Sequence, residues 1–141
     1  MSGDPGAAFA AAGASLVGTP FRLHGRDLET GIDCVGLVAL ALRRCGRTPL
    51  IPEGYTLRAL TVAPLLRFAD ANGFRAAALD GAQLPGDLLL LRPSPIQAHL
   101  AIALGVEGFV HAHARLGRVT VEAGRPPWPV VARWRLNTKA R

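Results

Sequence analysis

One cysteine and two histidines are the residues of this sequence that could perform covalent chemistry together. Cys34 opens an apolar segment directly after Asp33, and His99 and His111 stand in two alternating stretches of the second half. A thiol nucleophile needs an imidazole that takes its proton, and that imidazole needs a polar partner that fixes its tautomer. Cys34, His99 and His111 can fill these three roles.

The segment that carries Cys34 predicts a central helix over Cys34–Cys45. Asp33 stands where an N-cap belongs and Gly46 where a C-terminal cap belongs. Unpaired N–H groups and the helix dipole stabilise an anion in the first turn, so we predict a lowered pKa for Cys34 and room for a substrate beside Gly36. A buried core thiol is the alternative. Cys45 lies about 16 Å along the helix, beyond disulfide reach, and is predicted to be a core thiol.

The two histidines are predicted to lie on neighbouring strands, over residues 99–104 and 109–113. A three-residue loop over residues 106–108 would place His99 and His111 on one face of the hairpin, whereas a two- or four-residue loop would oppose them. Even on one face they are staggered, so a bulge or strong twist must bring the rings together. His113 shares the face of His111, and spacing alone does not choose between them.

The remaining pattern predicts an α+β fold with an antiparallel sheet, because helices come first and strands follow. Helical patterns cover residues 5–17 and, more weakly, 57–71 with an interruption at Pro64; further strands are expected over 88–91 and 118–122, with a loop over 92–97. We see no repeat or linker and predict one domain over residues 1–141. Asp87 is predicted to be a turn residue and His24 a solvated loop residue, whereas Trp128 and Trp134 are expected to pack against the C-terminal strand.

Composition narrows the classes of function. The 141 residues are 50% hydrophobic and carry a net charge of +6, which argues against disorder; two cysteines are too few for a disulfide scaffold, and no run reaches the length of a membrane span. Dispersed arginines and few aromatics argue against a nucleic-acid partner.

A zinc site built from Cys34, His99, and His111 or His113 stays open, although only His111 and His113 form a close-spaced pair. We expect no metal and no other cofactor.

Five segments, in order, resemble the NlpC-type cell-wall peptidases, which are papain-like cysteine endopeptidases of peptidoglycan. The resemblance runs from about Leu16 to Leu136. Its segments are Gly18-Thr19-Pro20-Phe21-Arg22, Gly31-Ile32-Asp33-Cys34-Val35-Gly36-Leu37-Val38, Pro85-Gly86-Asp87-Leu88, His99-Leu100-Ala101-Ile102 and Phe109-Val110-His111-Ala112. The resemblance implies a papain-like fold, with N-terminal helices and the nucleophile at a central helix N-terminus packed on the sheet.

The resemblance also implies roles for single residues. It makes Cys34 the nucleophile, His99 the general base and acid, and His111, rather than His113, the residue that orients His99. It places Phe21, Arg22, Asp33 and Gly36 at the substrate. The implied reaction is hydrolysis of an amide in peptidoglycan stem peptides, the γ-D-glutamyl–diaminopimelate bond, through a thioester acyl-enzyme. The basic loop with Arg22 and Arg26 is expected to favour these carboxylate-rich peptides.

Three departures from the family pattern carry further expectations. Val35 replaces the usual Ser and resembles the branch linked to phage tails and gene-transfer-agent particles, which predicts tail or baseplate proteins as partners. Phe21 replaces the usual Tyr, so the hydroxyl group of that Tyr is missing. The alternative hypothesis is therefore a catalytically inert wall-binding or structural tail component. The 65-residue spacing between Cys34 and His99 implies inserted material around residues 49–82.

The N-terminus carries an expectation about location. Met1-Ser-Gly-Asp-Pro-Gly lacks the basic start of a secretory signal, although residues 7–14 are apolar. This predicts synthesis in the cytoplasm without a signal peptide and action at the cell wall or periplasm after delivery on a tail particle.

Overall fold

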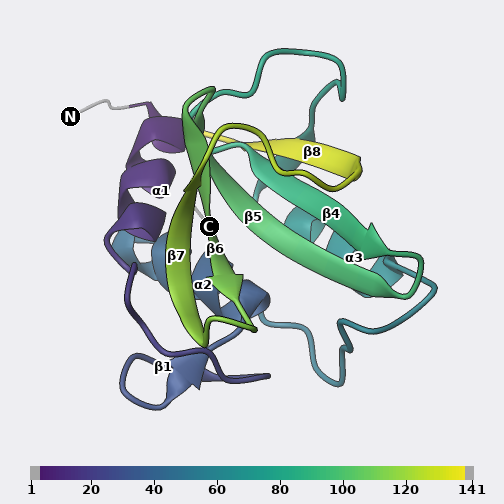
Figure 1. Cartoon of the computed structure of the whole chain (residues 1–141). Coiled ribbons are helices and arrows are strands. Elements are labelled where there is room, and N and C mark those ends of the chain that lie inside the picture. Colours follow the sequence, from purple (N-terminus) through teal and green to yellow (C-terminus); the bar gives the residue numbers. More distant parts are fainter. Residues whose placement is uncertain (1–3, 139–141) are drawn as a thin grey trace.

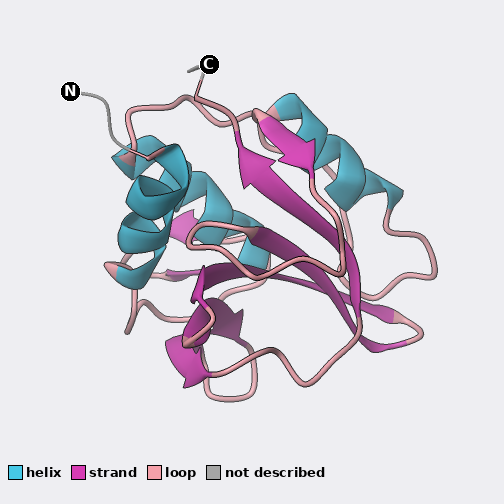
Figure 2. Ribbon diagram, turned by 90° about the horizontal axis from the view of Figure 1, so that it is seen from above, coloured by secondary structure: helices cyan, strands magenta, loops and turns pink. Residues whose placement is uncertain are grey.

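Helices and an antiparallel sheet make up the computed structural model, which describes residues 4–138 (Figures 1 and 2). The helices are α1 (Pro5–Ala14), α2 (Cys34–Arg44) and α3 (Ala63–Ala71). The strands are β1 (Arg26–Asp27), β2 (Gly31–Ile32), β3 (Phe74–Ala76), β4 (Leu88–Ser94), β5 (Gln97–Gly105), β6 (Gly108–His113), β7 (Arg118–Ala123) and β8 (Val130–Leu136). The first three residues of the N-terminal segment considered above lie outside the described residues.

Six strands form one sheet in the order β3-β8-β4-β5-β6-β7, and β1 and β2 form a separate short pair. Every neighbouring pair is antiparallel. The strand that follows β7 in sequence, β8, returns to the other side of β4 rather than lying beside β7. The predicted α+β class with an antiparallel sheet is confirmed.

The sheet has a different environment on each of its two faces. One face packs on α1 and α2 and forms the main core, which includes Phe9, Leu37 and Leu100 together with Cys34. Figure 2 shows the helices gathered on this side. The other face carries a smaller apolar cluster, Leu89, Leu91, Ala101, Ala103 and Phe109, against which Trp128 packs. This second face is the one that bears the histidines.

Several element boundaries differ from the sequence prediction. The first helix ends at Ala14, where Ser15 caps it, and not at residue 17. Pro64 lies in the first turn of α3 instead of interrupting a longer helix, because proline suits this part of a helix. Residues 92–94, predicted as loop, continue β4. Strand β8 carries Trp134 in the main core, as expected, whereas Trp128 lies before the strand on the other face.

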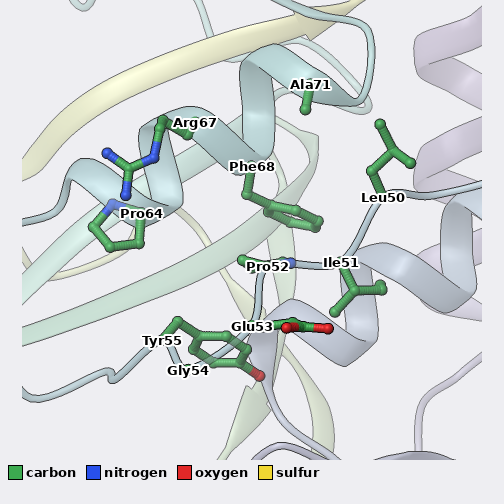
Figure 3. Close-up of a pocket in the computed structure, with 10 residues that line it drawn as sticks. All are labelled: Leu50, Ile51, Pro52, Glu53, Gly54, Tyr55, Pro64, Arg67, Phe68 and Ala71. Atoms are coloured by element: carbon green, nitrogen blue, oxygen red, sulfur yellow. The ribbon is translucent and has the colours of Figure 1, made fainter.

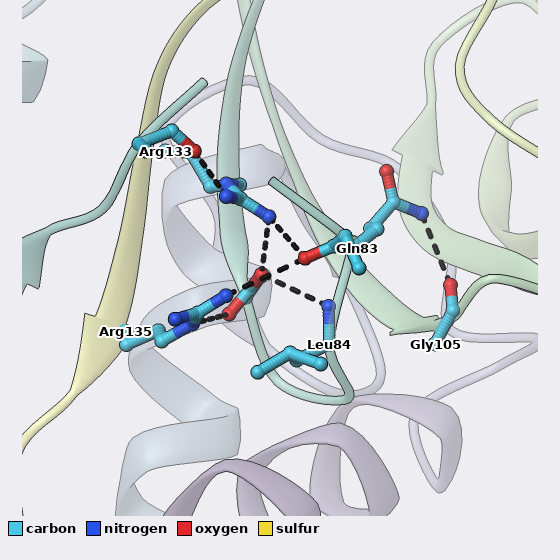
Figure 4. A network of polar contacts seen from close by, with 8 residues as sticks. Gln83, Leu84, Gly105, Arg133 and Arg135 are labelled. Carbon is cyan, nitrogen blue, oxygen red and sulfur yellow. Dashed lines mark hydrogen bonds and ion pairs between the residues drawn. The ribbon is translucent and has the colours of Figure 1, made fainter. Parts of the chain in front are cut away.

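Asp87 is more than a turn residue. Its side chain is 1% exposed and accepts hydrogen bonds from the Leu84 amide at 3.0 Å, Arg133 Nη1 at 3.2 Å and Arg135 Nε at 3.1 Å. Figure 4 shows the labelled side chains of Arg133 and Arg135, both from β8, in one network of polar contacts with Leu84. Asp87 therefore ties the start of β4 to β8, a long-range role that a local turn pattern does not show.

Among residues 4–138, no helix has both the length and the apolar character that crossing a membrane requires.

Candidate active site

The hairpin of β5 and β6 brings His99 and His111 to one face through a bulge. Its turn has two residues, Val106 and Glu107, between the paired Gly105 and Gly108. That turn alone would oppose the histidines. The register shifts between Gly105 and Ala103, which pairs with Phe109, so one extra residue is inserted in β5. The bulge restores the shared face that a three-residue loop was expected to supply.

A chain of hydrogen bonds joins three side chains on this face. His99 Nε2 lies 2.8 Å from His111 Nδ1, and His111 Nε2 lies 2.6 Å from Glu122 Oε2. His111 is buried, whereas the side chain of Glu122 is 39% exposed. His113 is not part of this chain; its Nδ1 accepts the Leu116 amide in the following turn. The structure thus brings together the two histidines that the family resemblance selected.

The surroundings keep both imidazoles neutral. Burial, followed by the charges of His111 and His113, lowers the pKa of His99 to about 3. Burial also lowers the pKa of His111, while the hydrogen bond and negative charge of Glu122 act against that shift. A neutral imidazole at His99 is able to accept a proton.

Cys34 lies at the first position of α2, as predicted, but its thiol is not acidic in this state. The residue is fully buried, and this burial, followed by the negative charge of Asp33, raises the pKa of Cys34 to about 12. Amides of Leu100, Val35 and Cys34 itself act against the rise. The predicted lowering is therefore wrong for the free protein, because burial outweighs the helix-start donors.

The donor from Leu100 locates the thiol relative to the histidines. Leu100 directly follows His99 on β5, and its amide is near enough to the thiol to act against the raised pKa of Cys34, so Cys34 lies beside the strand segment that bears His99. Among residues 4–138 no hydrogen bond joins the thiol to the His99 ring itself. His99 Nε2 is engaged by His111, so Nδ1 is the other ring nitrogen that could exchange a proton.

Asp33 caps the N-terminus of α2 and binds the loop that precedes it. Its carboxylate is fully buried and caps α2 by accepting the Gly36 amide at 2.8 Å. It also accepts the His24 amide at 2.9 Å, Arg26 Nη1 at 3.0 Å and the Tyr55 hydroxyl. These internal donors occupy the carboxylate, so what the structure shows for Asp33 is a positioning role; its predicted contact with substrate stays a prediction.

The other predicted substrate residues fall in different surroundings. A side chain at Gly36 would meet the Gly25 carbonyl at 2.4 Å, so the close approach there is made by the chain's own loop. Arg26 is paired with Asp33 and Tyr55, which leaves exposed Arg22 as the cation of this loop that faces solvent. Phe21 packs against the main core and also lines the cleft described next.

A cleft of about 560 Å³ opens beside the histidines. It is lined by His99, His111 and His113 together with Phe21, Leu57, Pro93, Gln97, Ala98, Ala112, Ala114, Arg115 and Trp128. The Trp128 ring centroid lies 6.0 Å from those of both His99 and His111. Ala98 and Ala112 line the cleft and also pack in the core that contains Cys34. The cleft therefore borders both the imidazoles and the region of the thiol.

A second cavity, of about 460 Å³, lies between residues 50–55 and α3. Figure 3 shows Phe68 and Arg67 of α3 on one side of it and Tyr55 on the other. Tyr55 lines this cavity and donates its hydroxyl hydrogen to Asp33. The histidines do not line it.

Sequence reasoning missed four residues of the site: Tyr55, Leu57, Trp128 and Glu122. Glu122 was placed on a strand but given no role; its alternation with Thr120 and its register opposite Phe109 put it diagonally beside His111. The others come from irregular segments, and no local pattern marks them. The zinc alternative gains no support, since the described part of the chain holds no cluster of three His, Cys, Asp or Glu side chains arranged for a metal ion.

Similarity to known proteins identifies the family of this chain. Residues 18–129 match the model of the NlpC/P60 family. The chain belongs to the NlpC/P60 family. The predicted family is thus confirmed, and members of the NlpC/P60 family are cysteine peptidases that hydrolyse peptidoglycan. No curated protein is significantly similar to the chain.

Solved structures of NlpC/P60 proteins share the fold. The NlpC/p60 domain of the peptidoglycan hydrolase SagA is 30% identical, with a TM-score of 0.55 over 84% of this chain and 88% of that one. NlpC1 from Trichomonas vaginalis is 22% identical, with a TM-score of 0.67 over 96% of this chain and 45% of that one. The peptidoglycan hydrolase RipB from Mycobacterium tuberculosis is 22% identical, with a TM-score of 0.61 over 93% and 64%. The chain spans about half the length of the two Trichomonas NlpC structures.

Proposed function

We propose that the chain is a cysteine endopeptidase that cleaves an amide bond in peptidoglycan stem peptides. The observation that carries this proposal is the position of the Cys34 thiol near the Leu100 amide, one residue along β5 from a His99 whose Nε2 is held by His111 beside an open cleft. Family membership supports the substrate class.

The reaction follows from these positions. The Cys34 proton passes to His99 Nδ1, and the sulfur forms a bond to the amide carbon while backbone N–H groups at the start of α2 hold the oxyanion. The C–N bond then breaks as His99 gives its proton to the leaving amine, which leaves a thioester. Water attacks the thioester, its proton goes to His99, and the C–S bond breaks to restore the thiol. Because both groups are neutral in the free protein, proton transfer accompanies attack on bound substrate rather than preceding it.

The finer assignments belong to the same proposal. The bond is the γ-D-glutamyl–diaminopimelate amide, supported by the family resemblance. Delivery to the cell wall or periplasm on a phage-tail or gene-transfer-agent particle, with tail or baseplate proteins as partners, is supported by Val35 in place of the usual Ser. Exposed Arg22 and Arg115, the latter at the cleft, suit a substrate rich in carboxylates.

Release of fragments from purified sacculi tests the proposal. The wild-type chain is expected to release peptides whose new termini, read by mass spectrometry, identify the bond, and Cys34→Ala is expected to release none. Cys45→Ala is the matched control, since Cys45 is the other free thiol and lies away from the cleft. Equal release by wild type and Cys34→Ala contradicts the proposal.

A second candidate is an inert wall-binding or structural tail component with the same fold. Two observations favour it: the Cys34 thiol is fully buried with a raised pKa, and Phe21 brings no hydroxyl to the cleft. Cosedimentation with sacculi separates the two candidates. Binding that is equal in wild type and Cys34→Ala, with no peptide released by either, selects the inert component.

A further inference from the structure

Glu122 on β7 ends the hydrogen-bond chain that begins at His99. Its Oε2 lies 2.6 Å from His111 Nε2, and the register that pairs Phe109 with Glu122 holds it on the histidine face. Glu122 does not line the cleft, so it does not meet substrate directly. It is the sole carboxylate bonded to either of these histidines in the described part of the chain.

The carboxylate of Glu122 determines which nitrogen of His111 and of His99 carries a hydrogen. An ionised carboxylate only accepts, so His111 Nε2 must carry the hydrogen that it donates to Glu122. In the neutral ring, His111 Nδ1 is then the acceptor, and the 2.8 Å bond requires His99 Nε2 to be the donor. His99 Nδ1 is consequently left with a lone pair.

We propose that Glu122 is a positioning residue that fixes the tautomers of His111 and His99 and so presents Nδ1 of His99 as the base for the Cys34 thiol. This inference rests on the proposed peptidase function for its kinetic consequence, but the tautomers themselves do not depend on activity. When His99 takes the thiol proton, the negative charge of Glu122 also stabilises the resulting imidazolium through His111.

Other charged groups near His111 do not supply this function. His99 on β5 is its neutral partner, and His113 on β6 lies 3.9 Å from Glu122 Oε2, beyond a hydrogen bond. Arg115 lines the same cleft, and no hydrogen bond or ion pair joins it to His111 among residues 4–138. Within residues 4–138, Glu122 is the one carboxylate that contacts His111 directly.

Nuclear magnetic resonance of protein with ¹⁵N-labelled histidine tests the tautomers without any substrate. The wild type is expected to show the Nε2–H form for both His99 and His111. Glu122→Gln keeps an acceptor but removes the charge, and is expected to lower the pKa of His111, which Glu122 otherwise raises. Glu122→Leu removes both and is expected to mix the tautomers. Unchanged tautomers and an unchanged His111 pKa in both variants overturn the proposal.

Kinetics supply the second readout once peptide release is measurable. Glu122→Gln is expected to lower kcat about ten-fold with KM unchanged, and to move the acidic limb of the pH profile to lower pH, since the His99 imidazolium loses its support and the neutral base persists to lower pH. Glu107→Gln, on the exposed turn of the adjacent hairpin, is the matched control and should behave as wild type. A raised KM with unchanged kcat contradicts a positioning role. If the wild type releases no peptide, the peptidase proposal fails while the tautomer experiment still decides the role of Glu122.

Discussion

The two halves of the candidate site are held in different ways. The helix half places a fully buried Cys34 beside a fully buried Asp33, whose carboxylate is saturated by donors from the chain. The sheet half runs from His99 through buried His111 to a Glu122 side chain that is 39% exposed, with an open cleft alongside. The helix half holds Cys34 in a fixed position, whereas the sheet half forms a chain of hydrogen bonds from His99 to Glu122.

Neither the thiol of the helix half nor the His99 imidazole of the sheet half is charged in the free protein. Burial raises the pKa of Cys34 and lowers that of His99, so both changes favour neutral groups. A thiolate and an imidazolium stabilise each other, and each is costly alone in this interior. Activity therefore depends on the two halves meeting at the substrate.

Removing the base from the sheet half should have the largest effect. His99→Ala is expected to lower kcat/KM for stem-peptide release by about 1,000-fold, because general base catalysis contributes on this scale. His113→Ala, which lacks the bond to His99, is expected to lose less than about ten-fold in the same assay. Similar losses in both variants would remove the distinction drawn here between the two histidines.

The helix half is tested by comparing the buried carboxylate of Asp33 with that of Asp87, which precedes β4. Asp33→Asn and Asp87→Asn each break a buried pair with arginine and are expected to lower the free energy of unfolding by about 3 kcal/mol, measured by denaturant titration. Of these two carboxylates, only Asp33 acts to raise the pKa of Cys34, so only Asp33→Asn should let alkylation of that thiol extend to lower pH. An alkylation profile shifted equally by Asp87→Asn would contradict the local role of Asp33.

The pH dependence of stability measures how deeply the sheet half is buried. The unfolded chain binds a proton at His99 below about pH 6.5, whereas the folded chain does so only near pH 3, so stability is lost as the pH falls through this window. Between about pH 6.5 and pH 4.5 we expect a loss of about 2 kcal/mol attributable to His99. Thermal unfolding of His99→Gln should show a smaller acid loss than the wild type; an identical loss would place the effect elsewhere.

What could be predicted from the sequence follows the same division. The helix half depends on neighbours in the chain: Asp33 as cap, Cys34 at the helix start and Gly46 with its positive φ of 81° at the helix end were all predicted and are observed. The state of the thiol could not be predicted in this way. Its pKa depends on burial by β5 and the rest of the core, which come from distant segments.

The sheet half could be predicted only in part, because pairing across strands is non-local. The histidines were predicted on neighbouring strands. Their shared face depends on a one-residue bulge, which the two-residue turn does not predict. Glu122 reaches His111 through the register of β6 and β7, and Trp128 covers the rings from an irregular segment. Asp87 was assigned to a turn because its arginine partners lie 46 and 48 residues away.

Trapping the acyl-enzyme tests most directly whether the two halves act together. The wild-type chain is mixed with a synthetic stem peptide, quenched in acid within the first turnover, and measured as intact protein by mass spectrometry, followed by mapping of the modified residue. The account predicts a mass increase equal to the acyl fragment, located on Cys34 and missing in Cys34→Ala and His99→Ala. Peptide cleavage that proceeds with no adduct on Cys34 and at the same rate in Cys34→Ala would contradict it.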